Sequence, residues 1–388
     1  MTLPGGPLEV PDGLTRWLNL FTAAGVFTLI AGLYFDSSRL WPNLLLLSFL
    51  MICVSLAGTV FIALQYVTGA SWSVALRRIA EAAAALLPLG GAGMLIILFL
   101  HPQIYPWAEG SHESMPHFRA LWLDLTFFRV RAVVYLLLWT FFTAGLLRGS
   151  RQQDEDGLPS HSRRNVRLSA AFLFVFGITF WLASFDWIMS VEPGWYSTIF
   201  GFYNFAGLFL AGLCVITLAA TWMSLRKPMQ EVITPSHLHD LGKLLFAFST
   251  FWMYLWFSQF MLIWYANIPE ESVYFVTRLH GLWRPLFYLN VAVNWVVPFL
   301  VLLPRTHKMR PGLLARVALL LLVGRWLDLY LMILPPYLGP KPAIGLWEIG
   351  LALGAVGIFG RAFFTAFRSA PAVPWHDPGL EESLHYHT

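Results

Sequence analysis

Long apolar stretches of this sequence contain Arg325, Asp328 and Asp186, and a charge in such a stretch is costly and marks a pathway or an internal pair. Arg325 and Asp328 are three residues apart and therefore share one face of a helix. At about 1.5 Å of rise per residue, Arg325 lies roughly 18 Å from the start of its stretch, near the middle of a membrane. Two interpretations stay open: a neutralising pair that fixes helix packing, or a charge-coupled step in proton transfer.

Asp186 lies late in another apolar stretch, in the aromatic run SFDWIMS. A carboxylate at the aromatic-lined end of a membrane helix favours a proton entry or exit, and a merely hydrated carboxylate is the alternative. Glu81, by contrast, follows Arg77 and Arg78 by about one helical turn, which favours an ordinary ion pair at the surface.

The stretch near 241–265 carries the longest polar pattern. It opens with His239, Asp240 and Lys243, and hydroxyl side chains then recur along one helical face at Thr250, Tyr254, Ser258 and Tyr265. Hydroxyls one or two turns apart, with waters between them, would relay protons from the charged trio toward the other side. The alternative is that each hydroxyl bonds a neighbouring helix, which is worth about 0.6 kcal/mol in a bilayer. Hydrogen bonding between helices is also the default for Asn290 and Asn294.

Histidine and cysteine positions argue against metal chemistry in this chain. A membrane haem b needs histidines that face each other from inside two helices, and all eleven histidines lie in gaps, in tails or at helix ends. The group His101, His112 and His117 is interpreted as a solvated loop. Cys53 and Cys214 form no CxxC or iron–sulfur spacing. We therefore expect no metal site.

The amino-acid composition indicates whether these stretches are surrounded by water or by lipid. Of the 388 residues, 57% are hydrophobic and 12% are charged, about half of the charged fraction of a soluble domain. The mean hydropathy is +0.63. So little charge argues against soluble, disordered and nucleic-acid-binding proteins and predicts an all-α polytopic membrane protein.

Ten stretches reach the roughly 20 apolar residues that a helix needs to cross a bilayer. They lie near 16–34, 43–67, 82–100, 126–147, 167–189, 197–223, 241–265, 285–303, 313–334 and 345–367. Pro88 and the glycines at 90, 91 and 93 are expected to bend the third.

Little of the chain lies outside these stretches. The sequence divides into an N-terminal tail over 1–15, a transmembrane domain over 16–367 and a C-terminal tail over 368–388. The charged segment 148–167 is predicted to be a flexible linker. The proline-containing C-terminal tail is predicted to be extended, and either bound to a partner or disordered.

The distribution of cations predicts the orientation of the spans. Seventeen of the 25 Lys and Arg residues fall on the side that holds both termini, seven fall on the other side, and Arg325 lies within a span. Both termini are therefore expected to be cytoplasmic.

Three long blocks, 183–207, 239–271 and 278–305, resemble one protein family in the same order. That family is the second large membrane subunit of alternative complex III, often labelled quinone-binding subunit 2. It belongs to the NrfD or polysulfide-reductase-like membrane proteins, and alternative complex III is a bacterial quinol:cytochrome c oxidoreductase. The resemblance covers essentially residues 15–370.

The resemblance implies ten transmembrane helices, with four-helix bundles formed by spans two to five and six to nine and with two peripheral helices. It implies a respiratory complex in the bacterial cytoplasmic membrane, where lipids surround the chain. The partners would be a paralogous quinol-binding membrane subunit, an iron–sulfur subunit, c-type haem subunits and small membrane subunits. This chain would hold no haem or iron–sulfur cluster. Quinone binding is better attributed to the paralogue, although the aromatic residues Trp187, Trp195 and Tyr196 also suit a quinone ring.

The family match and the polar stripe together give the candidate proton pathway. Its members are Asp186, His239, Asp240, Lys243, Tyr254, Ser258, Arg325 and Asp328. The predicted function is a non-redox subunit that contributes a proton path and a scaffold to quinol oxidation. The alternatives are a stand-alone secondary transporter and a purely structural scaffold.

Overall fold

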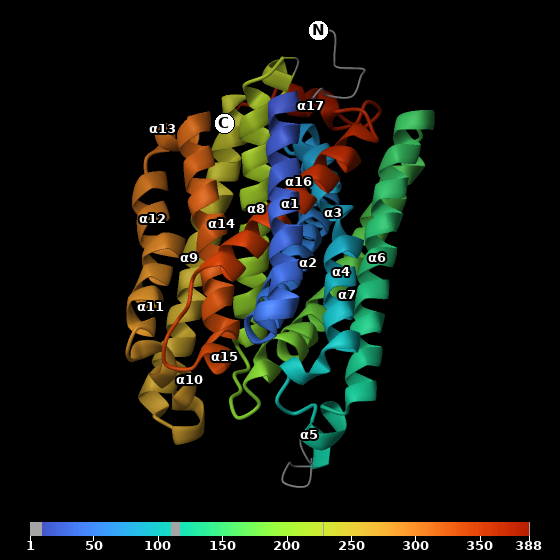
Figure 1. Ribbon diagram of the computed structural model, residues 1–388. Helices are drawn as coiled ribbons and strands as arrows, with labels where there is room; N and C mark the ends of the chain where they lie inside the picture. Colours follow the sequence, from blue (N-terminus) through green and yellow to red (C-terminus); the bar gives the residue numbers. More distant parts are fainter. Residues whose placement is uncertain (1–9, 110–116, 228, 388) are drawn as a thin grey trace.

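All regular elements of the described residues are helices (Figure 1). The computed structural model describes residues 10–109, 117–227 and 229–387. Within those residues, nine helices are long and apolar enough to cross a membrane. The prediction of an all-α polytopic membrane protein is therefore confirmed.

Helix α14 (Pro311–Ile333) corresponds to the ninth predicted span, 313–334, which is not among these nine helices. Its 23 residues extend about 35 Å, enough to cross a bilayer core. It carries Arg316, Arg325 and Asp328, so it is more charged than an ordinary span. It packs on α8 (Phe200–Ser224) inside the helix assembly.

The helices form the two bundles that the family resemblance implies (Figure 1). The first contains α2 (Ser37–Thr68), α3 (Arg77–Ala84) with α4 (Leu87–Leu100), α6 (Leu125–Asp156) and α7 (Pro159–Trp187). The second contains α8, α9 (Pro235–Ala266), the broken helix α11–η6–α12 (Trp283–Val291, Ala292–Val296 and Val297–Leu302) and α14. The heavily buried helices α2 and α8 contact each other and join the bundles.

Helices α1 (Asp12–Phe35) and α16 (Leu346–Arg368) lie side by side outside the bundles (Figure 1). Their contact depends on glycine, because a Cβ on Gly354 would lie 2.5 Å from the Cα of Gly25. A Cβ added to Gly350 would likewise clash with Thr28, and a Cβ added to Gly357 would clash with Thr22. The small-residue face of the tenth span thus serves close helix packing.

We expect Gly354→Val to separate α1 from α16. The added side chain would meet backbone rather than a movable side chain, and overpacking of this kind costs about 1–3 kcal/mol. A lowered midpoint of thermal unfolding in detergent would show it. Gly177→Val in α7 is the matched control, because a Cβ at Gly177 meets nothing within 4 Å. Equal midpoints for the two variants would contradict the prediction.

The third span is broken where the sequence predicts a bend. Helix α3 ends at Ala84 and α4 begins at Leu87, with Pro88 in its first turn. All eight residues of α3 are buried. Glu81 is buried with them and pairs with Arg78, which also binds Asp154 of α6. The expectation of a surface pair at Glu81 was therefore wrong.

The predicted flexible linker over 148–167 is also wrong. Helix α6 continues to Asp156, α7 begins at Pro159, and Gly157 makes the turn with a φ of 69°. Arg, Gln and Glu have high helix propensity, so the polar residues of this segment extend α6 and α7 beyond the apolar region. A glycine in the left-handed conformation ends α6.

The C-terminal tail folds back on its own chain. Helix α17 (Leu380–Leu384) packs on η1 (Val74–Leu76), and Ser383 donates to the carbonyl of Trp72. The described tail is therefore neither extended nor disordered. We call the side where α1 begins and α17 lies the terminal side, and the side of α5 (His117–Trp122), α10 (Pro269–Leu279) and α15 (Pro335–Leu338) the distal side (Figure 1).

Candidate functional site

The structure confirms that Arg325 and Asp328 form a pair. Nη1 of Arg325 lies 2.5 Å from Oδ2 of Asp328, and the two residues are 0% and 1% exposed. Asp328 is about 8 Å from the distal end of α14, at 1.5 Å per residue. The pair is thus enclosed by protein within the second bundle.

Each neighbouring helix of the second bundle gives Asp328 a hydrogen-bond donor. The hydroxyl of Tyr203 on α8 and Nδ2 of Asn290 on α11, at 3.0 Å, donate to Oδ1. Nε1 of Trp252 on α9 donates to Oδ2 at 3.1 Å. With Arg325, four donors hold the carboxylate, which is how a buried charge is stabilised.

Arg325 has a second partner in α8. Its Nη2 donates to Oδ1 of Asn204 at 2.9 Å, while its buried Nε has no partner. Gly207 makes room for the guanidinium, because a Cβ there would lie 2.4 Å from the Cζ of Arg325. The arginine therefore lies between a carboxylate and a neutral amide.

A π-helical turn, η6, adjoins this pair. Within it, Nδ2 of Asn294 donates to Oδ1 of Asn290 at 2.7 Å, and the backbone carbonyl of Asn294 accepts from Ser249 at 2.7 Å. The π-turn frees a carbonyl that α9 then satisfies, and such turns are frequent at functional sites. The two asparagines hydrogen-bond as the sequence indicates, and Asn290 also reaches Asp328.

A cavity of about 20 Å³ separates Asp328 from the distal side. That volume is about enough for one water molecule. Asp328, Asn290 and Tyr203 line it on one side, and Gln259 and Arg278 line it toward α10. It is therefore a polar space between the buried pair and the distal end of the bundle.

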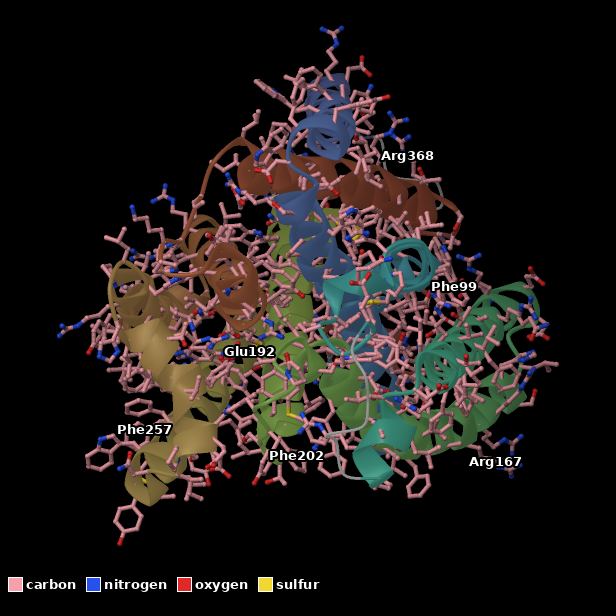
Figure 2. All side chains as sticks on the ribbon, turned by 60° about the horizontal axis from the view of Figure 1, so that its bottom comes forward. Phe99, Arg167, Glu192, Phe202, Phe257 and Arg368 are labelled. Atoms are coloured by element: carbon pink, nitrogen blue, oxygen red, sulfur yellow. The ribbon has the colours of Figure 1, made fainter. Side chains whose placement is uncertain are left out.

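Arg278 of α10 closes the distal end of this cavity. It donates to the carbonyls of Leu331 and Met332 at 2.6 and 3.1 Å, and its Nη2 lies 2.5 Å from Oε1 of Glu192. The Glu192 side chain is 19% exposed and lies near the centre of the distal face (Figure 2). The cavity thus lies between Asp328 and Arg278, and Arg278 in turn pairs with a carboxylate that solvent reaches.

Asp186 occupies a similar cluster in the first bundle. Arg131 of α6 binds it with two donors, Nη2 to Oδ1 at 2.9 Å and Nε to Oδ2 at 3.0 Å. Trp122 and Tyr135 donate to the same carboxylate at 2.8 and 3.1 Å. The Arg131 guanidinium lies 4.1 Å from the Trp122 ring centre. Asp186 is 1% exposed, so it is not simply hydrated.

The two clusters use the same donor types. In each, an aspartate on the last helix of a bundle accepts from an arginine, a tyrosine and a tryptophan. They differ in their surroundings, because Asp328 lines the water-sized cavity described above, whereas two nitrogens of one guanidinium hold both oxygens of Asp186.

The predicted trio at the start of α9 also forms a cluster. Asp240 pairs with Lys243, lies 3.8 Å from Nδ1 of His239, and accepts from the hydroxyl of Tyr386 at 2.6 Å. The tail therefore covers the terminal end of α9. Burial and the Asp240 carboxylate raise the pKa of Tyr386 to about 12.

We expect Tyr386→Phe to loosen the tail. A hydrogen bond to a charged group contributes about 1.5–3 kcal/mol, so hydrogen exchange of residues 380–387 should accelerate about tenfold or more. Because the pKa is raised, docking through the protonated hydroxyl persists below about pH 10 and is lost as pH rises through about 12. Tyr265→Phe, at a residue that is 84% exposed, is the control. Unchanged exchange in Tyr386→Phe would contradict the prediction.

The structure does not bring Tyr254 and Ser258 to the buried pair. At 100° per residue, Tyr254 lies on the opposite side of α9 from Trp252, and Ser258 lies about 120° around the helix from it. Tyr254 is 63% exposed, and Phe257 beside it lies at the edge of the molecule (Figure 2). The inward face of α9 instead carries Ser249, Trp252 and Gln259.

An apolar layer separates the Asp240 cluster from Arg325 and Asp328. Asp240 and Trp252 are about 18 Å apart along α9. Leu245 and Leu321 lie about 10 Å from Trp252 and Asp328 along their helices toward the terminal side, Leu213 lies about 15 Å from Tyr203 along α8, and all three leucines are fully buried. The two polar regions of this bundle are therefore separated by packed side chains.

The aromatic residues considered for a quinone are not arranged around one ring-sized space. Trp187 is fully buried among the rings of Phe49, Tyr135 and Trp139. Trp195 stacks on Tyr274 at 4.0 Å, and Tyr196 is 56% exposed. In the described residues there is no group of three His, Cys, Asp or Glu side chains that would hold a metal, and His112 lies outside those residues.

No protein-family model matches the sequence, and no curated protein matches it. The function therefore has to be inferred from the site and from the resemblance of the three sequence blocks.

Several residues of the site escaped sequence analysis. Tyr203, Trp252 and Arg278 look like ordinary members of an aromatic belt or a basic loop, and so do Arg131 and Tyr135. Of these residues, only Arg131 and Arg278 could have been recognised from the sequence, because a charge in or beside an apolar stretch indicates a functional site or an internal pair.

Proposed function

We propose that this chain is a non-redox membrane subunit of a respiratory quinol:cytochrome c oxidoreductase of the alternative complex III type, and that it contributes a proton path through its second bundle. Three sequence blocks support the family. One structural observation supports the path: the Arg325–Asp328 pair adjoins a water-sized cavity that is lined by Arg278, the partner of Glu192.

In this proposal Asp328 carries the proton. When Arg325 turns from Asp328 toward Asn204, the carboxylate loses its counter-charge and takes up a proton from the terminal side. Water must then enter the apolar layer at Leu245 and Leu321. When Arg325 returns, the proton leaves through the cavity toward Glu192. Each cycle moves one proton and leaves the pair unchanged.

Quinol oxidation in a partner subunit would drive this cycle. The coupling requires that the partner favours one position of Arg325 over the other. The proposed partners are a paralogous quinol-binding subunit, an iron–sulfur subunit, c-type haem subunits and small membrane subunits. The redox centres belong to them, and lipids surround the chain.

The proposed location is the bacterial cytoplasmic membrane, with the terminal side facing the cytoplasm. The excess of Lys and Arg on that side supports this orientation. In it, the Asp240 cluster faces the cytoplasm and Glu192 faces the outside.

A structural scaffold is the second candidate. The observation that favours it is the full set of four donors on Asp328, which also suits a permanently neutralised pair. A transporter of larger solutes has less support, because the cavity at the pair holds only about one water molecule.

Purification from native membranes tests the assignment. We expect an affinity-tagged chain to bring down c-type haem and iron–sulfur subunits, with quinol-dependent reduction of cytochrome c. Haem absorbance and mass spectrometry of the eluate measure this. A chain that purifies alone and binds a small solute would contradict the proposal and favour the transporter.

A further inference from the structure

A groove of about 260 Å³ lies in the first bundle, between the break in the third span and α6. Its walls include Ala84, Pro88 and Ala144. Arg148 and Arg151 line its end toward the terminal side. The groove therefore joins an apolar space to a basic end.

The broken helix explains why this space exists. Ala84 and Ala144 offer only methyl groups, and the chain between α3 and α4 leaves the helical path at Ala85 and Leu86. Pro88 has no backbone N–H, so the carbonyl of Ala84 receives no helical hydrogen bond from it. Small side chains and an interrupted helix leave room beside α6.

The length of the groove matches one leaflet of a bilayer. Thr140 and Arg151 both line it, and eleven residues of helix extend about 17 Å. Half of a hydrocarbon core of about 30 Å is about 15 Å. The groove is therefore about as long as one leaflet of the hydrocarbon core is thick.

The basic end carries positive charge that the described residues do not neutralise. Arg148 is exposed and forms no ion pair with any described residue. Arg151 donates to the hydroxyl of Ser369 at 3.0 Å, but its buried Nε has no partner. Asp154, one turn along α6, is already paired with Arg78.

We propose that this groove binds an anionic phospholipid of the terminal-side leaflet. The phosphate lies between Arg148 and Arg151, whose guanidiniums suit phosphate oxygens, and one acyl chain fills the space beside Ala144. A quinone is neutral and would leave both arginines without a counter-charge. This site is independent of the proposed respiratory function.

The test uses the full chain in whatever assembly it purifies. The protein is stripped of lipid in detergent and placed in nanodiscs of phosphatidylcholine with one tenth phosphatidylglycerol. Mass spectrometry then counts the phosphatidylglycerol molecules that remain bound after transfer back to detergent. The variants are Arg148→Gln with Arg151→Gln, and Ala144→Phe, which fills the groove and keeps both arginines. Arg163→Gln with Arg164→Gln, at two exposed arginines of α7 that do not line the groove, is the matched control.

We expect one tightly held phosphatidylglycerol per wild-type chain. The Arg148 and Arg151 double variant should bind it about 30-fold more weakly, and Ala144→Phe should also lose it. The control should retain it. No tightly held phosphatidylglycerol on the wild type, retention by the double variant or by Ala144→Phe, or an equal loss in the control would each overturn the proposal.

Discussion

The Asp328→Asn variant is expected to lose quinol-driven proton translocation and to unfold more easily than the wild type. The substitution keeps the size and the hydrogen-bond acceptor of the side chain but leaves Arg325, which is 0% exposed, without a counter-charge. Removing one partner of a buried pair costs about 3–5 kcal/mol. We expect a lower midpoint of thermal unfolding in detergent and no proton release in vesicles that contain the complex.

A second variant separates proton transfer from scaffolding. In Arg325→Gln with Asp328→Asn both charges are gone, while the amides still serve Tyr203, Trp252 and Asn204 as partners. We expect the double variant to recover most of the lost stability, to support quinol oxidation and still to release no protons. If it releases protons at the wild-type ratio to electrons, the pair is a scaffold and the proposed path is wrong.

Glu270→Gln is the matched control for these measurements. Glu270 is an exposed carboxylate on the distal side at the start of α10, and it contributes to neither cluster. Its neutralisation should change neither the unfolding midpoint nor the proton yield. A change in yield would indicate that general surface charge, rather than Asp328, sets the result.

The fold was largely predictable because each membrane span is encoded by residues that are adjacent in the sequence. Apolar length alone predicts ten spans, nine of which match described helices that are long and apolar enough to cross a membrane, and Pro88 marks the break in the third. The turn at Gly157 was missed because a polar, charged segment is equally compatible with a solvated helix and with a flexible linker. Whether α6 and α7 continue into this segment depends on how they pack against neighbouring parts of the protein. Ser150 and Gln153 are buried in that extension, which no property of the run itself reveals.

The site was predictable only along one helix. The spacing of Arg325 and Asp328 fixes a shared face, and the structure pairs them. The side of α9 that faces inward was not predictable, because in a membrane the outward face is as apolar as the core. Tyr254 therefore looked as suitable as Trp252, and only the packing of α9 against α8 and η6 decides between them. Partners from other helices, such as Tyr203, depend on tertiary structure alone.

Asp186 provides the decisive comparison, because it has the same types of donor as Asp328 in a closed setting. Asp186→Asn should lower the unfolding midpoint strongly, since Arg131 is 7% exposed and loses the only carboxylate that binds it in the described residues. The expected cost is again about 3–5 kcal/mol. The thermal midpoint and the yield of assembled complex measure it.

The double variant Arg131→Gln with Asp186→Asn should then behave differently from its counterpart in the second bundle. We expect it to recover stability, quinol oxidation and the full proton yield, because Asp186 fixes α5, α6 and α7 through Trp122, Arg131 and Tyr135 rather than carrying a proton. If the folded double variant turns over without releasing protons, Asp186 belongs to a second path, as its aromatic setting in the sequence suggested. The proposal thus holds that a buried aspartate with an arginine partner is insufficient for transfer, and that the adjoining space for water is the feature that distinguishes Asp328 from Asp186.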